Sequence, residues 1–172
     1  MTEVRLATVA DAEAIRAIYN EAVLTSTVTF DLRPRSLAEQ EAWLEARGGA
    51  HAVLVAVDPA DDRVVGFASL SPYRDRPAYA TTVEDSVYIA ADQRGRGVGR
   101  LLLGALVDVA TDHGFHTMIG RIVGGHDASI ALHRSCGFDL VGTEREVGRK
   151  FGRWLDVVVV QRLLGPTGPG GA

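Results

Sequence analysis

The 172-residue sequence is short of cysteine, of surplus positive charge and of long apolar runs. Cys136 is the single cysteine, so no internal disulfide can form, and a reducing compartment, the cytoplasm, is expected. The net charge of −4 argues against a nucleic-acid partner, because nucleic-acid binders are usually basic. No apolar stretch is long enough to span a membrane, and the N-terminus lacks the basic-then-apolar pattern of a signal peptide.

Metal ligands are also missing from any familiar arrangement. His51, His113 and His116 fit no metal-ligand spacing, and we predict no metal site. The stretch GPTGPGGA, residues 165–172, has no side chains that pack, which predicts a flexible tail. Residues 1–164 are numerous enough for one domain with a core of its own, and no linker or repeat divides them.

What the sequence does contain is apolar periodicity along most of its length. The boxes Thr8–Asp11 and Ser36–Glu39 are typical helix starts, and Gly114 is a typical helix end. The expected strands cover residues 4–7, 51–57, 64–70, 82–90, 117–123, 140–147 and 154–163. The expected helices cover residues 15–23, 36–48, 98–109 and 127–136. This order predicts an α/β fold, a mixed central β-sheet flanked by helices in a single domain.

One glycine- and arginine-rich stretch, QRGRGVGR (93–100), lies between an expected strand and an expected helix. Glycines let backbone N–H groups approach an anion, and a helix N-terminus favours negative charge, so a phosphate is the expected ligand. The P-loop is excluded because no Lys-Ser or Lys-Thr follows these glycines. The dinucleotide fingerprint is excluded because Arg100 stands where its third glycine belongs. What remains is the pattern R-x-x-G-x-G, Arg94–Gly99.

This pattern, in the context SVYIAADQRGRGVGRLLL, resembles the signature of the GNAT superfamily of acyl-CoA-dependent N-acyltransferases. The segment ASIALHRSCGF (128–138) resembles the second marker of that superfamily, and the likeness extends over about residues 4–164. Further segments look like the phosphinothricin acetyltransferase family, which includes methionine sulfone and methionine sulfoximine acetyltransferases. They are TSTVTF (25–30), SPYRDRPAY (71–79), TVEDSVYI (82–89) and KFGRWLDV (150–157).

The resemblance implies that acetyl-CoA is the co-substrate and that the phosphates are those of coenzyme A. Its pyrophosphate would lie on the glycine loop at a helix N-terminus, while its pantetheine arm would pair like an added strand with strand 82–90. That strand is expected to splay from strand 117–123. The alternative is a tight strand-to-helix turn with solvated arginines. The implied coenzyme-binding residues are Val87, Tyr88, Ile89, Arg94, Gly95, Arg96, Gly97, Val98, Gly99, Arg100 and Ser129.

Two residues are candidates for the proton transfers of acetylation. Glu84 is a carboxylate in mid-strand among apolar neighbours, and the family position that it matches is the proposed general base. The alternative is an edge-strand carboxylate that faces solvent. His133 matches the position of a proposed thiol acid and is a histidine in the phosphinothricin group too. The alternative is a helix histidine that packs beside the coenzyme.

A cationic group is expected to hold the carboxylate of an amino-acid-like substrate, because arginine binds carboxylates through two parallel hydrogen bonds. Arg74 and Arg76 match basic family positions that touch substrate, and the alternative is a solvated loop. Phe30 and Tyr79 match aromatic positions of the same pocket. One residue departs from the family pattern: His126 stands where an asparagine commonly binds the pantetheine amide.

These features predict an acetyl-CoA-dependent N-acetyltransferase that acts on the amine of a small amino-acid-like substrate in a ternary complex. Phosphinothricin, methionine sulfone and methionine sulfoximine are the substrate types that the resemblance implies, and it also implies a homodimer. A protein N-terminal or other amine acetyltransferase on the same fold remains an alternative, as does a non-catalytic acyl-CoA-binding regulatory domain.

Overall fold

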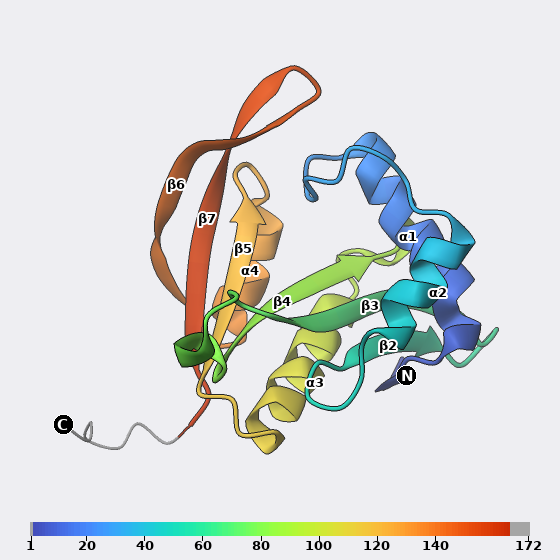
Figure 1. The fold of residues 1–172 in the computed structure, drawn as a ribbon. Coiled ribbons are helices and arrows are strands. Elements are labelled where there is room, and N and C mark those ends of the chain that lie inside the picture. Colours follow the sequence, from blue (N-terminus) through green and yellow to red (C-terminus); the bar gives the residue numbers. More distant parts are fainter. Residues whose placement is uncertain (1, 166–172) are drawn as a thin grey trace.

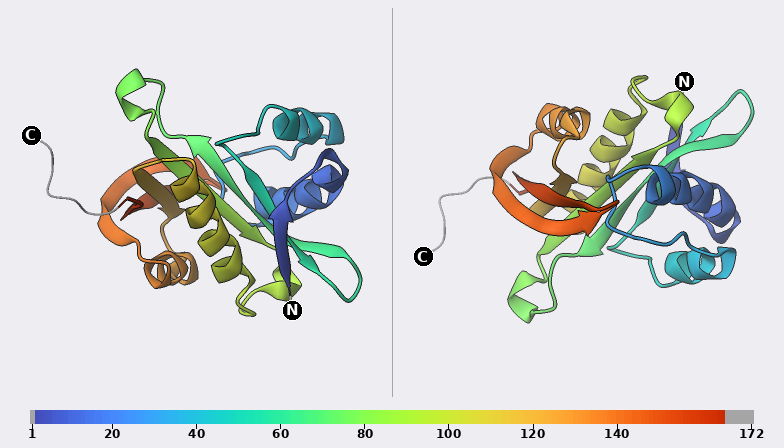
Figure 2. Two further views of the ribbon diagram at one scale, coloured as in Figure 1. Left: turned by 90° about the horizontal axis from the view of Figure 1, so that it is seen from below. Right: turned by 90° about the horizontal axis from the view of Figure 1, so that it is seen from above.

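A seven-stranded mixed sheet forms the centre of the protein, with two helices against each face (Figure 1; Figure 2). The computed structural model describes residues 2–165, and the sheet order is β1-β2-β3-β4-β5-β7-β6. The strands are β1 Glu3–Leu6, β2 Val53–Asp58, β3 Arg63–Pro72, β4 Thr82–Ile89, β5 Thr117–Val123, β6 Asp139–Lys150 and β7 Arg153–Leu163. The helices are α1 Ala12–Thr25, α2 Leu37–Glu45, α3 Val98–Asp112 and α4 Asp127–Ser135.

The predicted order of strands and helices and the predicted fold class are confirmed. Ser36 and Glu39 form the expected reciprocal capping box of α2. The Asp11 carboxylate accepts a hydrogen bond from the Thr8 N–H, but the turn that it starts is a short 3-10 turn that leads into α1. Helix α2 ends at Glu45, earlier than expected from the sequence.

Alternation of side chains along the inner strands gives the sheet an apolar core on each face. On one face Ala68 and Leu70 of β3 pack with Leu102 and Leu106 of α3. On the other face Phe67, their neighbour in β3, packs with α1 and α2. Buried β-branched residues predominate in β2, as expected for a strand covered on both sides.

The predicted domain, residues 1–164, ends just after β7, whose last residue is Leu163. The predicted tail, residues 165–172, lies outside the described residues except for Gly165. The domain boundary therefore stays a prediction. Among residues 2–165, no helix is long and apolar enough to cross a membrane.

Candidate active site

The sheet opens between β4 and β5. These strands are parallel and pair only from Thr82 with Thr117 to Asp85 with Gly120. Beyond that point β4 stays paired with β3 and β5 stays paired with β7, so the two halves of the sheet diverge (Figure 1). Residues 86–89 of β4 therefore present a free backbone edge, where an extended chain can pair as an added strand. The splay predicted from the sequence is confirmed at this position.

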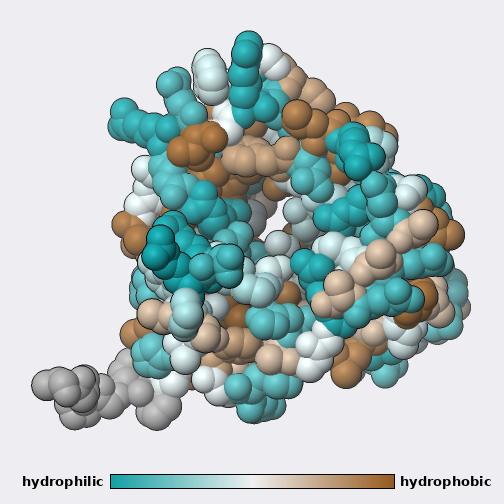
Figure 3. Space-filling view, viewed as in Figure 1, coloured by the Kyte–Doolittle hydropathy of each residue, from teal (hydrophilic) through white to brown (hydrophobic). Residues whose placement is uncertain are grey.

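The space-filling view shows a hollow over this opening, between the β6–β7 hairpin and the helices α1 and α2 (Figure 3). The segment after α1 reaches across to the hairpin. Lys150 Nζ donates a hydrogen bond to the carbonyl oxygen of Thr29 at 2.9 Å, although the Lys150 side chain is buried. Gly148 leaves room for the Phe30 ring, which a Cβ atom at that glycine would meet at 2.3 Å. The hollow is thus bounded by segments far apart in the sequence.

The glycine loop has the geometry of a backbone anion site. Gly95 and Gly97 have φ angles of 75° and 84°, which residues other than glycine rarely adopt. Gly97 is the N-cap of α3, whose first N–H groups have no acceptor within the helix. Arg94 donates to the carbonyl oxygen of Ile89 at the end of β4, while Arg96 and Arg100 are exposed around the loop. The loop therefore offers N–H donors and positive charge at one helix start.

Glu84 lies on β4 immediately before the strands part and faces the α1–α2 side of the sheet with Ser86 and Tyr88. Burial raises the pKa of the Glu84 carboxyl, while the Arg121 guanidinium and more weakly Arg74 act in the opposite direction. A carboxyl with a raised pKa is a better proton acceptor at neutral pH than an ordinary one. The geometry thus gives Glu84 the character expected of a general base.

His133 forms a buried pair with Asp85, which points to the α3–α4 face. Its Nε2 lies 2.9 Å from Asp85 Oδ2, and its Nδ1 lies 2.7 Å from the carbonyl oxygen of Ser129. Burial opposes the charged ring, but hydrogen bonding and attraction from Asp85 outweigh it, so the His133 pKa is raised. A Cβ atom at Gly120 would meet both partners at close to 3 Å, so the pair fits only because this residue is glycine.

The predicted substrate residues are partly gathered. Arg74 is exposed just after the end of β3, near the rings of Tyr73 and Tyr79. Its positive charge weakly lowers the pKa of Glu84. Phe30 lies against Gly148 of the β6–β7 hairpin. Among residues 2–165 no hydrogen bond or ion pair holds the Arg76 side chain, which is exposed at the start of the short 3-10 turn Pro77–Tyr79.

His126 is the N-cap of α4, and its Nε2 lies 2.9 Å from the hydroxyl of Thr27. Burial lowers the His126 pKa, so the ring is neutral at pH 7 and one nitrogen can accept while the other donates. His126, which stands where the family commonly has asparagine, therefore links the segment after α1 to the start of α4.

Sequence reasoning missed several polar residues around the opening. Asp85 is separated from His133 by 48 positions and Lys150 from Thr29 by 121, so no local pattern marks either contact. Arg121 of β5 forms an ion pair with Glu144 of β6 beside Glu84. For Asp85 one signal was present, since a second carboxylate in an otherwise apolar strand also needs a buried partner.

The described residues 2–165 contain no group of three or more His, Cys, Asp and Glu side chains that could hold a metal ion. The absence of a metal site therefore stays a prediction.

The family model of the acetyltransferase (GNAT) domain matches residues 4–159, and the chain belongs to this family. An L-methionine sulfoximine/L-methionine sulfone acetyltransferase from Pseudomonas paraeruginosa is 45% identical over 165 residues, 95% of either chain. A phosphinothricin acetyltransferase from Sinorhizobium meliloti, solved in complex with AcCoA, has a TM-score of 0.91 and 42% identity, covering 95% of this chain and 89% of its own. A ribosomal-protein-alanine N-acetyltransferase from Brucella melitensis has the same TM-score and identity, covering 94% and 99%. The predicted superfamily and the likeness to the phosphinothricin group are confirmed.

Proposed function

We propose that this protein transfers the acetyl group of acetyl-CoA to the amine of a small amino-acid-like substrate of the phosphinothricin, methionine sulfone or methionine sulfoximine type. The observation that carries the proposal is Glu84, a half-buried carboxyl with a raised pKa at the point where β4 and β5 part. The family match supports acetyl-CoA as the acyl donor, and the names of the relatives support a small amino acid as the acceptor.

In the proposed reaction the Glu84 carboxylate accepts a proton from the substrate ammonium, directly or through water. The free amine nitrogen then attacks the thioester carbonyl carbon, and the resulting oxyanion accepts a hydrogen bond from a backbone N–H of the free β4 edge near Val87. The carbon–sulfur bond breaks as the amide forms, and the second proton that the nitrogen loses passes to solvent. Direct transfer in a ternary complex is favoured because Cys136, the single cysteine, lies at the end of α4 and not beside Glu84.

His133 and Asp85 act together in the proposal as the source of the proton for the departing thiolate. The carbonyl oxygen beside Nδ1 can only accept, so Nδ1 carries a proton, and a second proton is shared between Nε2 and Asp85. Transfer of this second proton to sulfur leaves a neutral ring beside the carboxylate, and solvent restores it. The raised His133 pKa supports a protonated pair at neutral pH.

Coenzyme A is proposed to bind with its pyrophosphate on the amides of Arg94–Gly99, with the start of α3 and Arg100 adding positive charge. Its pantetheine arm would pair with Val87, Tyr88 and Ile89, whose edge is not paired with β5. Ser129, half-buried on α4, is proposed to contact the same arm. Arg74 and Arg76 are proposed to bind the substrate carboxylate, and Phe30 and Tyr79 to line the pocket.

The second candidate is a protein N-terminal acetyltransferase, which the name of the Brucella relative favours. It requires an open groove for a peptide, whereas the contacts of Phe30 with Gly148 and of Lys150 with Thr29 narrow the acceptor side. A non-catalytic acyl-CoA-binding domain is the third candidate, and turnover of any amine excludes it.

The test is release of the coenzyme A thiol from acetyl-CoA with methionine sulfone, methionine sulfoximine, phosphinothricin, a polyamine and a short peptide. The proposal expects turnover of the sulfur and phosphorus amino acids and little of the peptide. Turnover of the peptide alone transfers the protein to the second candidate. No turnover of any amine despite acetyl-CoA binding supports the third.

A homodimer in the cytoplasm completes the proposal. Several large apolar side chains of β6, of β7 and of the turn that joins them are exposed in the single subunit. They are Leu140, Val141, Val147, Phe151 and Trp154. Burying these side chains against a second copy removes apolar surface from water, which is the usual driving force of subunit association.

A further inference from the structure

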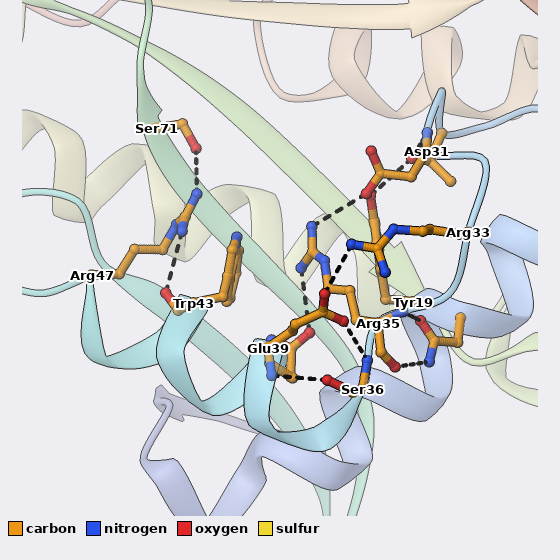
Figure 4. A network of polar contacts seen from close by, with 12 residues as sticks. Tyr19, Asp31, Arg33, Arg35, Ser36, Glu39, Trp43, Arg47 and Ser71 are labelled. Carbon is orange, nitrogen blue, oxygen red and sulfur yellow. Dashed lines mark hydrogen bonds and ion pairs between the residues drawn. The ribbon is translucent and has the colours of Figure 1, made fainter.

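A row of alternating arginine and aromatic side chains runs from Tyr19 of α1 across α2 to Arg47, just after that helix (Figure 4). Arg35 lies over the ring of Tyr19 at 4.0 Å and toward Trp43 at 5.2 Å, and Arg47 lies over Trp43 at 3.9 Å. Stacking on aromatic faces holds a guanidinium in a fixed orientation without using its N–H donors. The row therefore presents two oriented cations.

The two cations differ in how they are neutralised. Arg35 pairs with Asp31, whose carboxylate also accepts a hydrogen bond from the Tyr19 hydroxyl. Arg47 has no carboxylate partner among residues 2–165, and its buried Nε has no acceptor there. Its two hydrogen bonds go to neutral acceptors, the carbonyl oxygen of Trp43 at 3.2 Å and the Ser71 hydroxyl at 3.4 Å. Burial lowers the Arg47 pKa, because a half-buried cation without a counter-charge is less stable than one in water.

The acceptor of Arg47 connects it to the proposed site. Ser71 of β3 is the direct cross-strand partner of Glu84 of β4, so both side chains lie on the α1–α2 face. The Arg47 guanidinium is thus one strand further than Glu84 from the opening between β4 and β5. Adjacent strands are about 4.8 Å apart. A substrate whose amine lies at Glu84 and whose chain points away from the opening therefore brings its far end over Ser71.

We propose that Arg47 is a specificity residue that binds the oxygen atoms on the sulfur or phosphorus of the acceptor's side chain. This inference rests on the proposed function. The carboxylate of such an amino acid is attached to the same carbon as the amine and must stay close to Glu84. The sulfonyl or phosphinyl group is separated from that carbon by two methylene groups and reaches the neighbouring strand. The planar guanidinium can bind two oxygens on one sulfur or phosphorus atom. The sulfur atom of ordinary methionine carries no oxygen.

The test compares kcat/KM of the wild type and Arg47→Met for three amines. These are methionine sulfone, methionine, and 3-(methylsulfonyl)propylamine, which keeps the sulfone but lacks the carboxylate. Methionine at residue 47 still packs on Trp43 but donates no hydrogen bond. We expect a loss of about 10- to 100-fold for both sulfones, the usual effect of losing hydrogen bonds to a charged group, and little change for methionine. Arg33→Met is the matched control, since Arg33 is exposed and, among the described residues 2–165, its side chain bonds only to Glu39 of α2.

An equal loss for methionine and its sulfone overturns the proposal, as does a loss confined to the amines that carry a carboxylate. Arg47→Lys gives a second reading if Arg47→Met folds poorly in a thermal melt: it retains the charge but not the planar guanidinium, and it should lose part of the sulfone preference. If the wild type acetylates none of the three amines, the proposed function fails separately. Ligand-observed NMR with the coenzyme A complex then decides the subsite: sulfone binding that requires Arg47 supports it, and its absence overturns it.

Discussion

At the scale of single residues, the chemistry depends on where two neighbouring carboxylates of β4 point. Glu84 faces the acceptor side, where burial raises its pKa, and Asp85 faces α4, where it meets His133. Successive side chains of a strand point to opposite faces of a sheet. One dipeptide thus serves both proposed proton transfers, removal from the amine on one face and delivery to the thiol on the other.

Glu84→Gln should reduce kcat/KM by roughly 100- to 10,000-fold, the usual worth of a general base. The loss should be greatest between the raised Glu84 pKa and the pKa of the substrate ammonium, where the amine still needs a base. It should shrink above the ammonium pKa, where free amine is present. A pH profile of kcat/KM with methionine sulfone measures this, and a loss that is constant over pH would remove Glu84 as the base. Binding of acetyl-CoA serves as the control and should be retained.

Asp85→Asn should move the basic limb of the kcat profile to lower pH, because burial then lowers the His133 pKa with only the hydrogen bond to the Ser129 carbonyl opposing it. The pair stabilises the fold fully below the unfolded pKa of about 6.5 and loses this contribution as pH rises through the raised folded value. Chemical denaturation at several pH values should therefore show the largest difference from wild type in acid, up to about 3 kcal/mol.

The control for Asp85→Asn is Asp11→Asn, which removes another buried aspartate, paired with Arg5 beside the edge strand β1. It should lower stability without moving the kcat profile. An unchanged profile in Asp85→Asn would limit the pair to a structural role.

At the scale of elements, α3 carries the proposed phosphate site at its first turn and a matched turn at its other end. Gly97 and Gly114 have φ angles of 84° and 80°, and a Cβ atom at either would meet nothing within 4 Å. Alanine at either position should cost about 1 kcal/mol of stability through backbone strain. Only Gly97→Ala should also raise KM for acetyl-CoA, because only there must the backbone approach a phosphate. Equal KM values in the two variants would argue against the loop as the anion site.

At the scale of the whole molecule, most of the fold followed from local pattern. Periods of apolar side chains predicted each strand and helix, and R-x-x-G-x-G predicted the turn into α3. The contacts that close the site did not follow, because Thr27 with His126 and Arg47 with Ser71 join segments that only the folded chain brings together. Whether a polar residue is buried, and against which partner, depends on such long-range packing and leaves no periodic signal.

The exposed apolar side chains of the β6–β7 hairpin give a prediction at the same scale. Leu140 and Trp154 are 65% and 61% exposed in the single subunit, and a second copy that covers them would remove this apolar surface from water. Trp154→Asp should therefore shift the mass measured by light scattering from dimer to monomer, because an interface cannot bury an unpaired carboxylate cheaply. The control is Leu24→Asp, an exposed leucine in the last turn of α1, which should leave the mass unchanged. A wild type that is monomeric at every concentration would reject the dimer. A dimer that survives Trp154→Asp would move the interface to another face.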